Sequence, residues 1–248
     1  MMTGLFEDAL KAYEAGEFEN SLLLIKEFLR RKKEDGRGWE LLGLIQYSRG
    51  RIAVSVSAIE RATLYVPLRS VTRVCLALGY ARVGQEELGR DLLVDLVNEP
   101  VLTTELLLQV AAGLDSLGEP GFALQAARTA TEKDPDHAQA FYDLGYYVGR
   151  CGYPSSVIEA LARHAISLEP ERACYRIGLA KLLVGQQRED AAYELVRDLS
   201  IEQIKQVNCH KCLQRIVELY QSVGDYRRVI LCREKLLQLE LREYLSDC

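Results

Sequence analysis

The stretch GRGWELLGLIQYSRGRIAVSVSAIERATLYVPLR, residues 36–69, contains the pattern that the rest of the chain repeats. Its Gly50 has counterparts at intervals of thirty-four residues in both directions, which are Gly16, Gly84, Gly118 and Gly152. A fixed interval of this length is typical of repeat architectures, in which each repeat is one supersecondary unit. We therefore expect the 248 residues to form an array of similar units.

Within residues 36–69, the apolar spacing predicts two helices joined by a turn. Residues three and four positions apart share a helical face on both sides of Gly50: Trp39, Leu42 and Gln46, then Ser55, Ile59 and Ala62. Glycine can adopt the left-handed conformation that ends a helix without steric cost, so Gly50 fits the turn. Pro67 closes the unit because proline cannot continue a helix interior.

Counting from these landmarks divides the chain into seven units. They cover residues 2–35, 36–69, 70–103, 104–137, 138–172, 173–206 and 210–245, with small insertions before the last two. The eighth position of six units is small, as expected where the two helices of a pair approach closely: Ala9, Gly43, Ala77, Ala111, Gly145 and Ala180.

The arrangement Trp39-x2-Leu42-Gly43, followed by Ala62 and Pro67, resembles the tetratricopeptide repeat, whose period is thirty-four residues. Residues 138–172 also resemble this repeat. Two other units depart from its pattern: Leu5 stands at the tryptophan position of the first unit, and Gln46 stands in the second unit where tyrosine is usual. The resemblance implies an all-α fold, a right-handed superhelical solenoid of about seven antiparallel helix pairs over residues 1–248. Each pair would bury its apolar face against its neighbours.

The resemblance also implies that first helices line a concave groove and that fixed positions of each unit face it. We expect these residues to bind a partner: Phe6, Leu10, Tyr13, Glu40, Leu44, Tyr47, Leu78, Arg82, Asp115, Tyr142, Tyr146, Arg150 and Lys181. Aromatic and aliphatic side chains would supply the binding energy and the few charges the orientation. Alternatively, some of the tyrosines pack between repeats.

Family members that grip acidic C-terminal tails use Lys and Asn at defined positions of successive first helices. This chain has Glu40, Leu41 and Leu44 there in the second unit, and Val74, Cys75 and Leu78 in the third. We therefore expect no carboxylate clamp in these units.

The last helix is predicted over residues 231–245, where six leucines lie among charged residues and occupy more than one helical face. One interpretation is that this helix caps the core of the array. The other is that it mediates homo-oligomerisation through its second apolar face.

The segment Cys209-His210-Lys211-Cys212 has a spacing that suits a metal ligand pair or a redox pair. If Asn208 caps a helix there, the helix dipole would favour a cysteine thiolate at its first turn. If Ser200 and Gln203 start the helix as a capping box, both cysteines lie within it as packing residues. Zinc would need a second ligand pair, and Cys232 and Cys248 provide no such pattern.

Composition argues against several classes of ligand. The chain has 36 acidic and 31 basic residues and a net charge of −5, so we expect no nucleic acid partner. The basic run Arg30-Arg31-Lys32-Lys33 is interpreted as the end of a helix, where cations complement the dipole, rather than as a nucleic-acid patch.

We expect no membrane segment, because no apolar run is long enough. Seven scattered cysteines fit a reducing compartment, so the cytoplasm is expected.

No catalytic arrangement of residues is apparent. His137, His164 and His210 are far apart, and the adjacent acidic pairs point to different faces of a helix. We predict a non-catalytic scaffold or adaptor, without a cofactor, that binds a peptide or helix of a protein partner in its groove. The alternative is a thiol- or metal-regulated protein that acts through Cys209 and Cys212.

Overall fold

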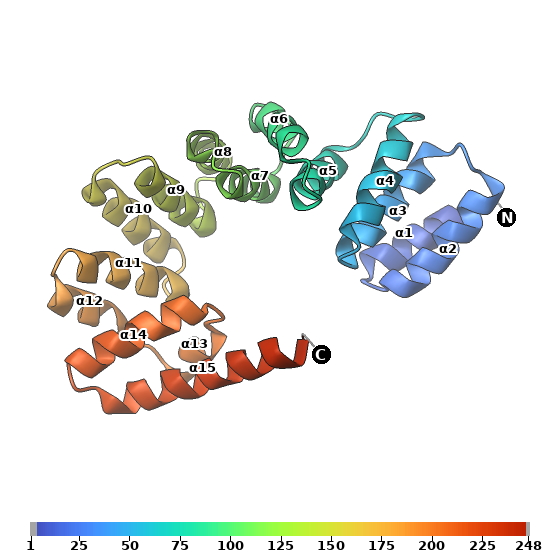
Figure 1. Cartoon of the computed structure of the whole chain (residues 1–248). Coiled ribbons are helices and arrows are strands. Elements are labelled where there is room, and N and C mark those ends of the chain that lie inside the picture. Colours follow the sequence, from blue (N-terminus) through green and yellow to red (C-terminus); the bar gives the residue numbers. More distant parts are fainter. Residues whose placement is uncertain (1–3, 247–248) are drawn as a thin grey trace. The chain divides into compact units, whose positions relative to one another are not determined.

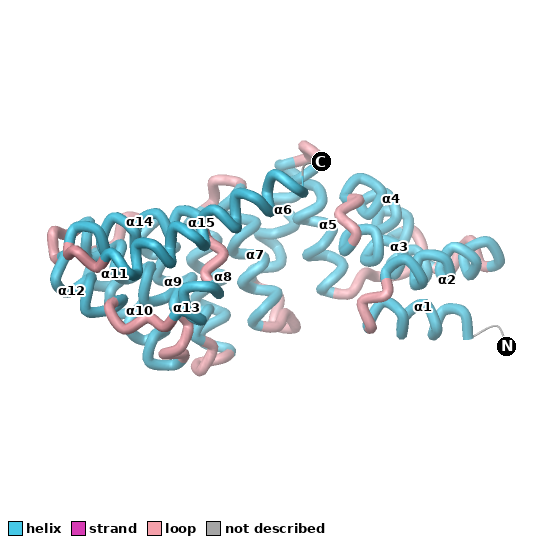
Figure 2. The backbone as a smooth tube through the Cα atoms, turned by 90° about the horizontal axis from the view of Figure 1, so that it is seen from below, coloured by secondary structure: helices cyan, strands magenta, loops and turns pink. Residues whose placement is uncertain are grey.

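A computed structural model describes residues 4–246 of the chain, with side chains described for residues 4–241. The described residues form fifteen α-helices and no strand (Figures 1 and 2). The chain divides into two compact units, residues 1–133 and residues 134–248, and each is considered by itself. The expectation of an all-α fold built from antiparallel helix pairs is confirmed.

Unit 1 is a stack of four helix pairs, in which each helix packs on the one that follows it. Its helices are α1 (Gly4–Glu14), α2 (Phe18–Arg31), α3 (Gly36–Ser48), α4 (Ile52–Thr63), α5 (Ser70–Arg82), α6 (Glu86–Val97), α7 (Thr104–Ser116) and α8 (Pro120–Lys133). The first helices α1, α3, α5 and α7 are also in contact from one pair to the next, so they form one side of the stack.

Unit 2 continues the pattern with three pairs and one additional short helix. Its helices are α9 (Ala138–Arg150), α10 (Ser155–Leu168), α11 (Ala173–Gly185), α12 (Glu189–Val196), α13 (Ile201–Gln206), α14 (His210–Ser222) and α15 (Tyr226–Ser246). Helices α11 and α14 contact each other as first helices of successive pairs, and α13 packs against α15 and α11.

The turn between the helices of a pair keeps the same backbone conformation in both units. Gly50 has a φ of 73°, and the other glycines of the series also have positive φ. In the pair α11–α12 the corresponding position holds Gln187, whose φ is 60°. The left-handed turn therefore persists where the glycine is absent, at a steric cost that a non-glycine residue bears there.

Close helix contact explains the small residues at the eighth position. Ala9, Ala77 and Ala111 are completely buried. At Gly43, an added Cβ would lie 2.3 Å from Cγ1 of Ile59 in α4, so α3 and α4 approach each other too closely for a side chain. At Gly145, the nearest atom would be 3.4 Å away, which is an ordinary contact distance.

Trp39, at the best-matching repeat, is a packing residue, as predicted. Its ring packs against the core of unit 1, which includes Ile25, Leu41 and Ile45. Its indole N–H donates a hydrogen bond of 2.7 Å to the carbonyl of Lys33. These contacts join α3 to the connection that follows α2.

The end of the sixth unit forms a separate short helix, α13, and this corrects the prediction for the cysteines. Ser200 and Gln203 do form a capping box, but the helix that they start ends at Gln206. A new helix, α14, begins at His210 with Cys209 as its N-cap. The two cysteines therefore do not lie in the middle of one helix, and Asn208 is not the cap.

The last helix, α15, begins at Tyr226 and has two apolar faces along its described side chains. Val229, Cys232 and Leu239 are buried in the core of unit 2, as a capping helix requires. Leu237 and Leu241, by contrast, are about three-fifths exposed, at 60% and 62%. Leu245, part of the predicted apolar set, lies outside the residues whose side chains are described. None of the described helices is long and apolar enough to cross a membrane.

Candidate functional site

Two neighbouring hollows of unit 2 contain most of the exposed residues predicted for its first helices. The first, called here the α9–α11 hollow, has a volume of about 470 Å³. It is lined from α9, α10 and α11 by Tyr142, Asp143, Gly145, Tyr146, Gly149, Arg150, Ile158, Ala162, Gly178, Leu179, Lys181 and Leu182. Four predicted partner-binding residues are thus brought together: Tyr142, Tyr146, Arg150 and Lys181.

The two tyrosines of α9 have different environments. Tyr142 packs against α11: its ring centroid lies 4.8 Å from that of Tyr175, and an added Cβ at Gly178 would lie 1.8 Å from its hydroxyl oxygen. Burial raises the pKa of Tyr142. Tyr146, one turn later, is 52% exposed. Tyr142 therefore contributes to helix packing as well as to the wall of the hollow, whereas Tyr146 offers its ring to solvent.

A buried carboxyl group forms part of the same wall. Burial raises the pKa of Asp143, and a hydrogen bond of 2.6 Å from the amide of Gln139 opposes this effect. The hydroxyl of Tyr175 donates a hydrogen bond of 3.2 Å to the amide oxygen of the same Gln139 side chain. The amide nitrogen and the amide oxygen of Gln139 are thus both hydrogen-bonded. This network fixes α9 against α11 and holds the hollow in shape.

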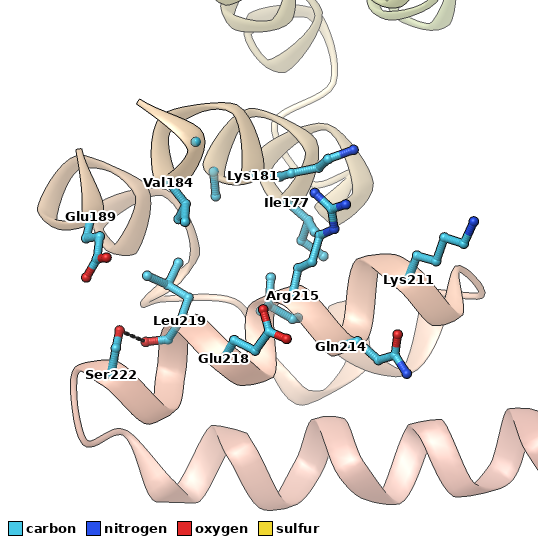
Figure 3. A pocket seen from close by; sticks show the side chains of 13 residues that line it. Ile177, Lys181, Val184, Glu189, Lys211, Gln214, Arg215, Glu218, Leu219 and Ser222 are labelled. Atoms are coloured by element: carbon cyan, nitrogen blue, oxygen red, sulfur yellow. Dashed lines mark hydrogen bonds between the residues drawn. The ribbon is translucent and has the colours of Figure 1, made fainter. Parts of the chain in front are cut away.

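The second hollow, called here the α11–α14 groove, has a volume of about 610 Å³ and shares Lys181 with the first (Figure 3). Its lining comes from α11, the start of α12, and α14: Ile177, Ala180, Lys181, Val184, Gly185, Glu189, Lys211, Gln214, Arg215, Ile216, Glu218, Leu219 and Ser222. The deeper residues are apolar and the rim is charged. Such a surface suits a segment of another protein.

Four residues of this groove were missed by sequence reasoning: Lys211, Gln214, Arg215 and Glu218. Lys211, Gln214 and Glu218 stand at positions 2, 5 and 9 of the unit that begins at His210, so the same positional rule finds them. The insertion of residues 207–209 after α13 shifts the register of this unit. Arg215 could not be found by that rule, because its side chain reaches the groove from position 6.

In unit 1, two predicted partner-binding residues are buried, and we correct their assignment. Glu40 is 4% exposed, and its carboxylate accepts hydrogen bonds from the backbone N–H of Arg69 at 3.0 Å and from the hydroxyl of Thr72 at 2.6 Å. It also forms an ion pair with the Arg69 guanidinium at 3.2 Å. Glu40 therefore ties α3 to the start of α5. Leu44 is likewise 4% exposed and belongs to the packed interior.

Other predicted residues of unit 1 make contacts within the chain. Phe6, Leu10 and Tyr13 pack against the unit 1 core. Arg82 lies over the ring of Tyr47, 5.4 Å from its centroid, and donates to its hydroxyl at 3.1 Å.

The remaining two predictions of unit 1 are half-buried. An added Cβ at Gly113 would lie 2.5 Å from Cδ2 of Leu78, so Leu78 packs between α5 and α7. Asp115 is also half-buried. The predicted face of unit 1 is thus largely occupied by contacts between its own repeats.

The cysteine pair marks the start of α14. The Cys209 sulfur accepts a hydrogen bond of 3.2 Å from the backbone N–H of Cys212, so a thiol replaces the usual hydroxyl or carboxylate cap. Cys209 is exposed and Cys212 is half-buried. Burial, together with a hydrogen bond from its thiol to the Cys209 sulfur, raises the pKa of Cys212 to about 12.

Within the described part of the chain, no group of three His, Cys, Asp or Glu side chains could hold a metal ion. His137 is half-buried and caps α9, because its Nδ1 accepts a hydrogen bond of 3.2 Å from the backbone N–H of Ala140. Arg30 and Arg31 of the basic run form ion pairs with Glu27. His137, Arg30 and Arg31 therefore make contacts within the chain that stabilise its helices.

The stacked helix pairs and the hollows along their first helices define a class, the helical repeat proteins. Within that class, residues 6–65 match the model of the tetratricopeptide repeat family. This match and the fold support the predicted resemblance to tetratricopeptide repeat proteins. The family is in general a non-enzymatic protein-interaction fold.

Solved structures with the same fold include three that cover most of the chain or two thirds of it. The C-terminal part of a tetratricopeptide repeat protein from Cytophaga hutchinsonii has a TM-score of 0.67 at 12% identity and covers 94% of this chain and 95% of its own. YrrB, a tetratricopeptide repeat protein with an unusual peptide-binding site, has a TM-score of 0.57 at 19% identity, covering 69% and 88%. MamA has a TM-score of 0.57 at 15% identity, covering 67% and 97%. No curated protein matches the sequence at a significant level.

Proposed function

We propose that the protein is a non-catalytic interaction scaffold, and that it binds a segment of a partner protein along the first helices of unit 2. The observation that carries this proposal is the pair of adjoining hollows, about 470 and 610 Å³, with Lys181 in the rim of both. Volumes of this size accept a few side chains of a partner. Tyr146 supplies an exposed aromatic anchor, a residue type enriched among those that dominate binding energy.

Support also comes from the contrast with unit 1, where the equivalent residues Glu40, Leu44 and Tyr47 are committed to contacts between repeats. YrrB, which has a similar fold, has a peptide-binding site. The cytoplasmic location expected from the sequence stays a prediction.

The test uses a photoreactive amino acid placed at one of two matched tyrosines. Tyr146 lies in the α9–α11 hollow and is 52% exposed, whereas Tyr153 lies in the turn before α10 and is 48% exposed. The full chain carrying the probe at either position is irradiated in native extract, and cross-linked peptides are identified by mass spectrometry.

We expect one recurrent partner segment to cross-link at position 146 and not at position 153. Equal labelling at the two positions, or labelling at position 153 alone, would contradict the proposal.

A second candidate function, thiol regulation, is favoured by the position of Cys209. An exposed sulfur that caps α14 while a second thiol sits in the same first turn is a suitable pair for disulfide formation. A small disulfide RSSR would supply the oxidising equivalents. The Cys209 thiolate attacks it and releases one RSH, and then the Cys212 sulfur loses its proton, attacks the mixed disulfide and releases the second.

This candidate is tested by treating the protein with oxidised glutathione and measuring its intact mass. The predicted product has lost two hydrogen atoms, and the wild-type chain is restored by a reducing thiol. Cys209→Ser replaces the capping sulfur with an oxygen that can also cap α14, and it serves as the matched control. This variant should not form the internal disulfide. A stable glutathione adduct on Cys209 without loss of the second glutathione would refute an internal pair.

A further inference from the structure

The α11–α14 groove has charges of opposite sign at its two ends, and these specify the chemistry of its occupant. Resting on the proposed function, we propose that the groove binds an extended partner segment with acidic, then apolar, then basic side chains. The acidic side chains lie at the end formed by Lys181 and Arg215, and the basic ones lie near Glu189.

The cationic end is built by two facing helices. Lys181 of α11 and Arg215 of α14 extend into the same space from opposite sides (Figure 3). Lys211 lies one turn before Arg215, in the first turn of α14, where the helix dipole is also positive. All three side chains belong to exposed residues.

These cations differ from several arginines of unit 2 that are held in ion pairs. Arg163 and Arg188 both bind Glu159, and Arg176 binds Asp198. None of the ion pairs formed by the described residues of unit 2 involves Lys181, Lys211 or Arg215. Cations that face one another without a partner repel, and an anion placed between them relieves that repulsion. The occupant of this end is therefore negatively charged.

The middle of the groove is apolar. Ile177 and Ile216 form its floor and are 1% and 2% exposed. Val184 of α11 is 39% exposed and lies on the rim opposite Leu219 (Figure 3). Aliphatic side chains of a bound segment would remove this rim from water.

The far end carries a carboxylate, because Glu189 begins α12 just beyond the end of α11. Glu218 lies between the two ends, one turn after Arg215 on α14 (Figure 3). The hydroxyl of Ser222 is already used, because it donates to the carbonyl of Leu219 at 2.9 Å. This end therefore favours a cation.

The same carboxylates argue against a nucleic acid. A polyanion lying along the groove would gain contacts at Lys181 and Arg215 but would meet Glu218 and Glu189 next. The groove is also short. Arg215 and Ser222 lie seven positions apart on α14, which is about 10 Å of helix, and an extended chain covers that length with about three residues. A partner segment with three apolar residues between its charged groups therefore matches the length of groove that α14 forms.

The test uses a defined peptide with blocked ends, acetyl-Glu-Asp-Leu-Val-Leu-Lys-Lys-amide, so that no terminal carboxylate takes part. Two controls are the same peptide with Gln-Asn in place of Glu-Asp, and a peptide of identical composition with the charges intermixed. A labelled oligonucleotide of seven thymidines is the fourth probe. Binding to the full-length protein is measured by fluorescence anisotropy at low and at high salt.

We expect the first peptide to bind at least about tenfold more tightly than either control peptide and than the oligonucleotide, and to weaken with salt. Arg215→Glu should cost about tenfold or more in affinity. Arg233→Glu, which changes an exposed cation of α15 outside the groove, should alter it by less than about twofold. Circular dichroism checks whether both variants fold. If one of them does not, the comparison of the peptides on the wild-type chain still tests the proposed charge pattern.

Three results would overturn this inference. They are equal binding of the Gln-Asn peptide, equal binding of the intermixed peptide, and tighter binding of the oligonucleotide. None of them contradicts the proposed function, which rests on cross-linking at position 146. If the cross-linked partner segment lacks clustered acidic residues, the charge pattern is wrong although the scaffold function stands.

Discussion

Units 1 and 2 place different chemistry at the same repeat positions. In the second repeat, position 5 is Glu40, which binds the start of the next repeat, and position 9 is Leu44, and both are buried. In the fifth repeat the same positions are Tyr142, which packs, and Tyr146, which is exposed beside a hollow. A repeat position therefore predicts which face a residue occupies, but the neighbouring repeat determines whether the side chain is free to bind a partner.

The largest expected difference concerns the eighth position. Gly43→Ala places a Cβ 2.3 Å from Ile59, whereas Gly145→Ala meets nothing closer than 3.4 Å. We expect Gly43→Ala to lower the free energy of unfolding by about 2 to 3 kcal/mol through overpacking. Gly145→Ala should be neutral or stabilising by about 0.5 kcal/mol, because alanine favours the helix. Urea denaturation of the two variants compares them, and equal stabilities would disprove the difference in helix approach.

Next in size is the removal of a carboxylate. Glu40→Ala leaves the backbone N–H of Arg69 and the hydroxyl of Thr72 without their acceptor, and should cost about 2 kcal/mol of unfolding free energy. Tyr146→Ala, at an exposed position, should cost less than about 0.5 kcal/mol but weaken partner binding. Thermal melts and binding assays of both variants separate the roles. Reduced partner binding by Glu40→Ala with an unchanged melt would restore Glu40 to the binding surface.

A smaller effect depends on pH. Burial raises the pKa of Cys232 in unit 2 from 9.0 to about 12, and that of Cys75 in unit 1 to about 11. The folded chain keeps these protons where the unfolded chain loses them, so each thiol stabilises the fold below pH 9 and loses that contribution as pH rises through the folded pKa. Between pH 8 and pH 10, the wild type should lose about 1 kcal/mol more than Cys232→Ala. Denaturation at both pH values measures this, and parallel losses would contradict it.

The smallest effect tests the turn in the pair α11–α12. Gln187 has a φ of 60° at the position where the other pairs have glycine. Gln187→Gly should therefore raise the free energy of unfolding by about 0.5 to 1 kcal/mol, since the steric cost of the left-handed conformation exceeds the added entropy of the unfolded chain. Gly152→Ala, in the preceding pair, should lower it by a similar amount. Chemical denaturation compares the two, and a loss of stability in Gln187→Gly would contradict the steric argument.

The helix pairs could be predicted from the sequence because their determinants are local. Gly50 and Pro67 define a turn and an end within one repeat, and the spacing of Trp39 and Leu42 defines the packed face. The end of α13 at Gln206 and the capping of α14 by the Cys209 sulfur were not predictable in this way. Both follow from how α13 packs against α15 and α11.

The candidate site was only partly predictable for a related reason. Tyr146 and Lys181 were found by their positions, whereas the burial of Glu40 depends on Arg69 and Thr72, which lie some thirty residues further along the chain. Arg215 reaches the groove by the length of its side chain and not by its place in the repeat. Contacts of this kind appear only when neighbouring repeats are stacked.

Lys181 lies in the rim of both hollows, so the two hollows share one positive charge. A carboxylate that binds Lys181 from the α11–α14 groove lowers the attraction that a second anionic group would find in the α9–α11 hollow. By thermodynamic linkage the reverse holds to the same extent. Two anionic segments would therefore bind with negative cooperativity, while an uncharged aromatic segment beside Tyr146 could be held together with an acidic one.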